Sequence, residues 1–125
     1  MRLFVFGDKT FIRKFTGQEI NGVEMTGISG IDELLKRLTD GKADIILVSG
    51  LKDDAGVSCE LIKGSCRIPI ALLVRENHTN WSQLGYFTVD GFIPEQASGD
   101  ELKARLDAIW RRCVYYENEV KKPVL

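Results

Sequence analysis

Ala43-Asp44-Ile45-Ile46-Leu47-Val48-Ser49-Gly50 is the stretch that decides how the chain folds. Four consecutive apolar residues, Ile45 to Val48, end abruptly in a small polar pair. An unbroken apolar run of this kind is typical of a strand that is buried on both faces of a parallel sheet. Ligand sites of open α/β sheets lie just beyond the carboxyl ends of the strands. We therefore predict that Ser49 faces whatever site the fold has.

Four further segments on either side of this stretch also have the pattern of strands, and they alternate with helical patterns. The predicted strands cover 2–7, 23–28, 44–48, 68–74 and 91–94, and the predicted helices cover 8–18, 30–40, 57–63, a short stretch around 81–86, and 98–119. A β-α unit repeated five times predicts a five-stranded parallel sheet with helices on both faces. Residues 1–116 form this domain, and we expect 117–125, which contain Pro123, to be a C-terminal tail or linker.

Composition and charge argue against several classes of protein. The 125 residues suffice for one domain with a sizeable core, and the net charge of −1 offers no basic surface for nucleic acid or an anionic membrane. No apolar run approaches the roughly 18 residues of a membrane span. The three cysteines, Cys59, Cys66 and Cys113, match no zinc spacing, and the first residues lack the long apolar region of a signal peptide. We expect reduced thiols in a cytoplasmic protein.

The order and spacing of four segments resemble the receiver domain of bacterial response regulators. The third predicted strand looks like the family's strand of Pro-Asp, four aliphatic residues and Asp. The fourth looks like its Ile-Pro-Ile-Ile strand, and the fifth like its Ala-Asp-Gly-Tyr-Leu strand. These segments are 43–49, 68–73 and 89–93, followed by a last helix from Ser98 that carries Arg111-Arg112. The resemblance covers roughly residues 2–112. It implies a flavodoxin-like (CheY-like) fold and a role in two-component, phosphorelay-type signalling.

The phosphorylation chemistry of that family depends on five groups, and this chain keeps one of them. Carried over by position, the first acid after the first strand is replaced by Gly7, and the second is kept as Asp8. The phosphoacceptor Asp is replaced by Ser49, the hydroxyl after the fourth strand by Val74, and the Lys after the fifth strand by Glu95. The resemblance therefore implies a degenerate phosphoacceptor pocket.

Each replacement has a chemical consequence. A serine at position 49 cannot form an acyl phosphate, and Asp8 alone is a poor magnesium site because that ion prefers several oxygen ligands. Glu95 puts a negative charge where a phosphoryl group needs a positive one. We predict a pseudo-receiver without catalytic residues, enzyme activity or a cofactor, magnesium included.

Aromatic residues in the fourth and fifth units suggest how such a domain acts. In the resembled family, this region together with the last helix is where partners bind and dimers form. We expect contact with a protein partner or a neighbouring signalling domain, or a homodimer through the last helix and fifth strand. The alternative is ordinary core and rim packing. The candidate residues are Trp81, Tyr86, Phe92, Trp110 and Arg111.

Two other functions stay open from the sequence. Phe4 to Asp8, with Phe15 and Gly17, also looks like the F subunit of V-type ATPases, a rotary stalk component, although the strong last helix disfavours this hypothesis. The second alternative is a phosphorylatable receiver with a displaced acceptor at Asp53 or Asp54. This acidic pair is also the remaining candidate for a metal ligand besides Asp8, but such pairs in loops are more often simply solvated.

Overall fold

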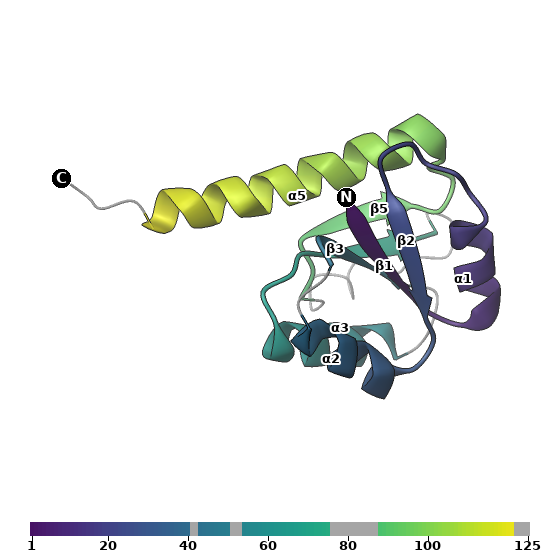
Figure 1. The fold of residues 1–125 in the computed structure, drawn as a ribbon, viewed down its shortest axis with the longest axis horizontal. Helices are drawn as coiled ribbons and strands as arrows, with labels where there is room; N and C mark the ends of the chain where they lie inside the picture. Colours follow the sequence, from purple (N-terminus) through teal and green to yellow (C-terminus); the bar gives the residue numbers. More distant parts are fainter. Residues whose placement is uncertain (41–42, 51–53, 76–87, 122–125) are drawn as a thin grey trace.

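The computed structural model describes residues 1–40, 43–50, 54–75 and 88–121, with side chains as far as Val114. Strands and helices alternate along the chain (Figure 1). The predicted helix around 81–86 lies outside the described residues. The elements are β1 (Arg2–Phe6), α1 (Lys9–Thr16), β2 (Glu24–Ile28), α2 (Ile31–Thr39), β3 (Ile45–Ser49), α3 (Ala55–Ser65), β4 (Ile70–Val74), β5 (Gly91–Pro94) and α5 (Gly99–Lys121).

The five strands form one parallel sheet in the order β2-β1-β3-β4-β5. This confirms the predicted flavodoxin-like fold. The chain goes from β1 outward to β2, then crosses back over β1 to reach β3. The strand order therefore reverses between β1 and β3, and ligands of such sheets bind beyond the carboxyl ends of the strands at this point.

Helices cover both faces of the sheet because neighbouring residues of the central strands point to opposite sides. Leu3 and Val5 belong to the core layer under α1 and α5, whereas Phe4 and Phe6 belong to the layer under α2 and α3. Figure 1 shows these helices on the two sides of the strands. All five residues of β3 are buried, as its unbroken apolar sequence predicts.

The last helix packs on the sheet with its first half and continues beyond it. Leu102, Leu106 and Ile109 are buried, which confirms the predicted apolar stripe. Figure 1 shows the later turns of α5 projecting from the body of the domain, and the helix continues to Lys121, past residue 116, where we predicted a tail. No helix in the described ranges is long and apolar enough to cross a membrane.

Asp90 connects three elements at the amino ends of β4 and β5. Its Oδ2 accepts hydrogen bonds from the Lys63 Nζ at 2.5 Å and from the Ile70 backbone N–H at 2.7 Å. Its backbone carbonyl accepts a hydrogen bond from Arg112 on α5. These contacts fix the start of β4 and hold α5 at the amino ends of the strands.

Candidate functional site

The carboxyl ends of β1, β3, β4 and β5 meet at one edge of the sheet. Strand register pairs Phe6 with Val48, Ser49 with Leu73, and Val74 with Pro94. The residues that end or follow these strands are therefore neighbours, although they lie far apart in the sequence. This edge holds Asp8, Ser49, Val74 and Glu95.

One carboxylate oxygen of Asp8 caps the helix that follows it. Its Oδ1 accepts a hydrogen bond from the Phe11 backbone N–H at 2.8 Å, so Asp8 is the N-cap of α1. This cap satisfies one of the free N–H groups at the start of the helix. The retained acid therefore has a structural role that needs no ligand.

The aromatic ring of Phe11 fills the space next to Gly7. A Cβ atom at this position would lie 2.6 Å from Cδ1 of Phe11 and 3.1 Å from Cβ of Ser49. The ring of Phe11 packs against that of Phe15, with centroids 4.9 Å apart, and both residues are buried in the core. An acidic side chain at position 7 does not fit unless Phe11 moves.

Ser49 and Val74 are both buried at this edge. Ser49, the last residue of β3, is the hydroxyl at the position where the resemblance places an acid. Val74, the last residue of β4, belongs to the core layer under α2 and α3. The position carried over as a hydroxyl is thus part of the apolar core.

Glu95 is held by two cations. The Arg75 Nε donates to its Oε2 at 2.6 Å, and the Arg75 Nη2 donates to its Oε1 at 2.8 Å. Lys14 on α1 adds a third contact, with its Nζ 3.6 Å from Oε1. The hydrogen bonds from Arg75 lower the pKa of Glu95, and the charges of Arg75 and Lys14 lower it further. Partial desolvation raises it, but the net effect is a pKa of about 2. Glu95 therefore carries a full negative charge at neutral pH.

Sequence reasoning missed Arg75, Lys14 and the role of Phe11. A signal for Arg75 was present, because Arg75 directly follows one strand and Glu95 directly follows the next. Residues that follow neighbouring parallel strands in register lie side by side, so opposite charges there predict an ion pair. The signal for Phe11 is weaker, since helical spacing places it on the buried face of α1 but does not say what space it fills.

Magnesium does not fit the described residues at this edge. Asp8 caps a helix, Gly7 offers no ligand, and Ser49 and Val74 supply no carboxylate. No three side chains of His, Cys, Asp or Glu converge within the described ranges to hold a metal ion. The exposed Asp54 precedes α3, and Asp53 lies outside the described residues.

The candidate interaction residues are spread over different parts of the surface. Phe92 is 39% exposed and pairs in register with Leu72, so it points to the sheet face that carries α2 and α3. Trp110 is 37% exposed on α5, which covers the opposite face, and its neighbour Arg111 is exposed. Trp81 and Tyr86 lie outside the described residues.

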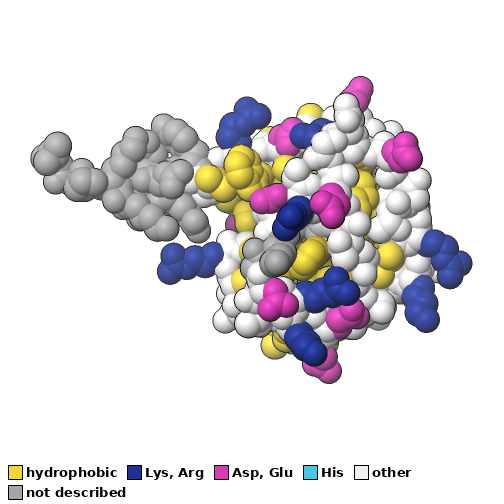
Figure 2. Space-filling view, viewed as in Figure 1, with side chains coloured by type: hydrophobic (Ala, Val, Ile, Leu, Met, Phe, Trp, Pro, Cys, Tyr) yellow, Lys and Arg dark blue, Asp and Glu magenta, His cyan; other side chains and the backbone are white. Residues whose placement is uncertain are grey.

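The surface around α5 is the most apolar part of the view in Figure 2. Hydrophobic side chains gather there beside the projecting part of the helix, whereas Lys, Arg, Asp and Glu are interspersed over the rest of this face. Trp110 lines a hollow of about 270 Å³ together with Ile68, Pro69 and Val114. The hollow lies at the amino ends of β3 and β4, away from Glu95.

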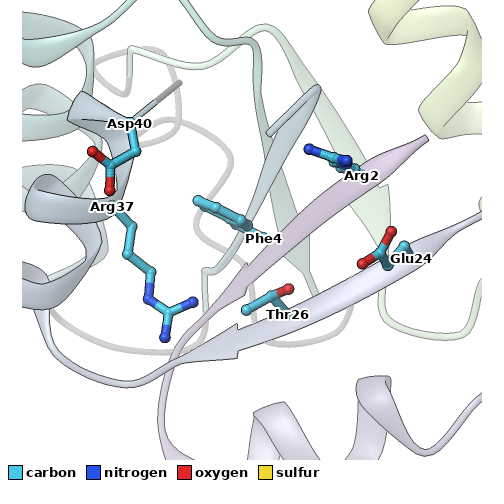
Figure 3. Close-up of a pocket in the computed structure, with 6 residues that line it drawn as sticks. All are labelled: Arg2, Phe4, Glu24, Thr26, Arg37 and Asp40. Atoms are coloured by element: carbon cyan, nitrogen blue, oxygen red, sulfur yellow. The ribbon is translucent and has the colours of Figure 1, made fainter. Parts of the chain in front are cut away.

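A further hollow, of about 420 Å³, lies beside β1, β2 and α2 (Figure 3). Arg2 and Arg37 line it together with Glu24 and Asp40, so its charged groups balance. Arg37 already pairs with Glu33 at 3.2 Å. Because Arg2 and Glu24 begin their strands, this hollow is separate from the carboxyl ends of the strands, where Asp8, Ser49 and Glu95 lie.

Comparisons with known proteins give a clear answer on the fold. No protein-family model and no curated protein matches the chain. The receiver domain of the Francisella response regulator 1452 is similar in structure, with 22% identity, 89% of this chain and 97% of that chain covered, and a TM-score of 0.65. A response regulator receiver modulated diguanylate cyclase from Pelobacter carbinolicus has 14% identity, coverage of 94% and 97%, and a TM-score of 0.68.

A third similar chain comes from a complex of the histidine kinase ThkA with the response regulator protein TrrA. It has 19% identity, coverage of 86% of this chain and 97% of that chain, and a TM-score of 0.63. At such identities, the likeness shows that this chain has the fold of receiver domains. Its activity and partners have to be argued from its own residues.

Proposed function

We propose that this chain is a receiver-fold signalling domain that acts through protein–protein contacts, without phosphorylation at the end of β3. The ion pair between Arg75 and Glu95 carries the proposal. It places a satisfied carboxylate where the resembled family has a lysine that binds the phosphoryl group.

Electrostatics and covalent chemistry both oppose phosphoryl transfer at this edge. Glu95 is ionised at neutral pH and would repel a phosphoryl oxygen. The charge of Arg75 is matched by that carboxylate, and an anion would have to compete for it. Ser49 offers a hydroxyl where an acyl phosphate requires a carboxylate, and Phe11 fills the space next to Gly7.

Contacts through α5 are the proposed mode of action. Trp110 is a large, partly exposed aromatic residue next to Arg111, and these two residue types often supply much of the binding energy of an interface. The partner we propose is a signalling protein, a neighbouring signalling domain, or a second copy of the chain. A similar chain that was solved with a histidine kinase supports this class of partner.

The proposed location is the cytoplasm. Cys59, Cys66 and Cys113 are free thiols in the structure, in agreement with a reducing compartment. Burial raises the pKa of Cys59 to about 11, so this thiol is a poor nucleophile at neutral pH.

Thermal melting with magnesium and beryllofluoride tests the proposal, because beryllofluoride mimics a phosphoryl group on an aspartate. Light scattering after size exclusion monitors the mass of the same samples. We expect the melting temperature and the mass to be the same as with magnesium and fluoride alone. A shift that requires beryllium would overturn the proposal, and Asp54→Asn would then show whether a displaced acceptor produces it.

A further inference from the structure

A cavity of about 220 Å³ opens between the carboxyl ends of β1 and β3 and the first turns of α2 and α3. Gly7 and Ser49 form part of its wall, so it borders the degenerate phosphoacceptor pocket. The cavity lies at the point where the strand order reverses, which is where ligands of this sheet topology bind. Phe11 fills the space beside Gly7, but the side toward α2 and α3 stays open.

Apolar side chains form the outer wall of this switch-point cavity. Val57 is 63% exposed and Leu61 is 46% exposed, and both line the cavity together with Ile31. They are two of the four large hydrophobic side chains that are exposed in the described part of the chain. A ligand in the cavity would remove their apolar surface from water, which is favourable.

Hydrogen-bond donors also border the cavity. Ser58 is only 8% exposed and lines the cavity, and its hydroxyl makes no hydrogen bond to another described residue. Both adjoining helices also begin without a side-chain cap, α2 at Gly30 and α3 at Asp54. Backbone N–H groups in the first turn of a helix have no partner within that helix, so the neighbourhood of these two helix starts favours a hydrogen-bond acceptor.

The charges of the residues around the cavity indicate which net charge a ligand can carry. Asp54 lines the cavity, and no Lys or Arg among the described residues does so. Among the described residues of the wall, an anionic ligand would face Asp54 without a compensating cation. A cationic ligand would face the positive ends of two helix dipoles. An uncharged molecule avoids both penalties.

We propose that the switch-point cavity binds a small uncharged organic molecule with a hydrogen-bond-accepting carbonyl group. The carbonyl oxygen accepts from Ser58, and the apolar part packs against Ile31, Val57 and Leu61. An apolar cavity of about 150 Å³ holds benzene, so this one has room for a single ring with one substituent. The proposal does not depend on whether the domain takes up phosphoryl groups.

Nuclear magnetic resonance titration of the isotope-labelled chain tests the site with three probes of matched shape. Benzamide is neutral and has a carbonyl group, benzoate is anionic, and benzylamine is cationic at neutral pH. We expect benzamide to shift the amide signals of Ile31, Val57 and Ser58 saturably, and the other two probes to bind at least about tenfold more weakly. Equal or tighter binding of a charged probe, or no saturable shift with benzamide, would overturn the proposal.

Two variants show whether binding uses the proposed contacts. Ser58→Ala removes the inner hydroxyl and should weaken benzamide binding by up to about tenfold. Ser65→Ala is the matched control, because this exposed serine on the same helix bonds to the Leu61 carbonyl at 2.8 Å. Leu61→Asp changes an exposed wall residue without touching the core, and it should abolish binding while the fold persists. Unchanged affinity in both Ser58→Ala and Leu61→Asp would contradict the proposed site.

Discussion

The guanidinium of Arg75 donates two hydrogen bonds, of 2.6 and 2.8 Å, to the carboxylate of Glu95 at the carboxyl ends of β4 and β5. Each residue directly follows its strand, and Val74 and Pro94 before them are paired in register. Such a two-point contact fixes the relative orientation of both groups. An internal ion pair therefore lies at the carboxyl ends of β4 and β5, where the resemblance to receiver domains implies a lysine.

Glu95→Gln should make unfolding less sensitive to acid. The native pKa of Glu95 is about 2, below its ordinary value of 4.5, so its stabilisation is fully present above pH 4.5 and is lost as the pH falls toward 2. At neutral pH we expect the variant to melt a few degrees lower than the wild type. This gap should shrink between pH 4.5 and 2, as followed by circular dichroism.

Glu101→Gln is the control for this experiment. Glu101 pairs with Arg105 at 3.2 Å on the exposed side of α5, and such pairs contribute little. A constant gap between Glu95→Gln and the wild type at all pH values would contradict the role of the Arg75 pair.

Gly7→Ala should destabilise the domain although it adds one methyl group. The new Cβ would lie 2.6 Å from the Phe11 ring, and overpacking of this kind costs about 1–3 kcal/mol. Urea unfolding measures the change. Gly64→Ala is the control, because nothing lies within 4 Å of its added Cβ, and helix propensity favours alanine there by about 1 kcal/mol.

A double variant identifies the cause of that loss. If the Phe11 ring is responsible, Gly7→Ala should cost less when Phe11→Leu is also present, and the coupling energy from the cycle should be favourable. Additive effects would mean that another contact, such as the one with Cβ of Ser49 at 3.1 Å, and not the ring, resists the change.

Leu106→Ala should cost about 2–5 kcal/mol of unfolding free energy, because Leu106 is fully buried in the middle of the stripe that packs α5 on the sheet. Arg105→Ala, one residue away on the exposed side, should cost less than about 0.5 kcal/mol. Urea unfolding of both variants checks the prediction. Similar losses for the two would show that the helix does not pack through this stripe.

Trp110→Ala should weaken association and leave folding intact. The side chain is partly exposed, and an aromatic anchor of an interface typically contributes about 2 kcal/mol or more to binding. Light scattering over a concentration series measures self-association, and Val57→Ala on α3 is the control for a distant exposed apolar residue. If Trp110→Ala and wild type associate equally, with themselves and with any partner that is found, α5 is not the interface.

The order of strands and helices was accessible from the sequence because it depends on local patterns. The apolar run before Ser49 predicted a strand buried on both faces, and β3 is buried throughout. The spacing of Leu102, Leu106 and Ile109 predicted the buried face of α5. Boundaries were less accurate: α3 spans Ala55–Ser65 where the pattern indicated 57–63, because a helix with few polar residues has a weak periodic signal.

The sequence by itself also determined which chemical groups stand at the ends of the strands, a serine at 49, a valine at 74 and a glutamate at 95. Only the tertiary structure decided what those groups contact. Strand register brings Arg75 to Glu95 across 20 residues of sequence, and helix packing places the Phe11 ring in the space next to Gly7. Local periodicity reports which residues are buried, but side-chain partners depend on how separate elements pack. For that reason the ion pair and the switch-point cavity emerged only from the folded chain.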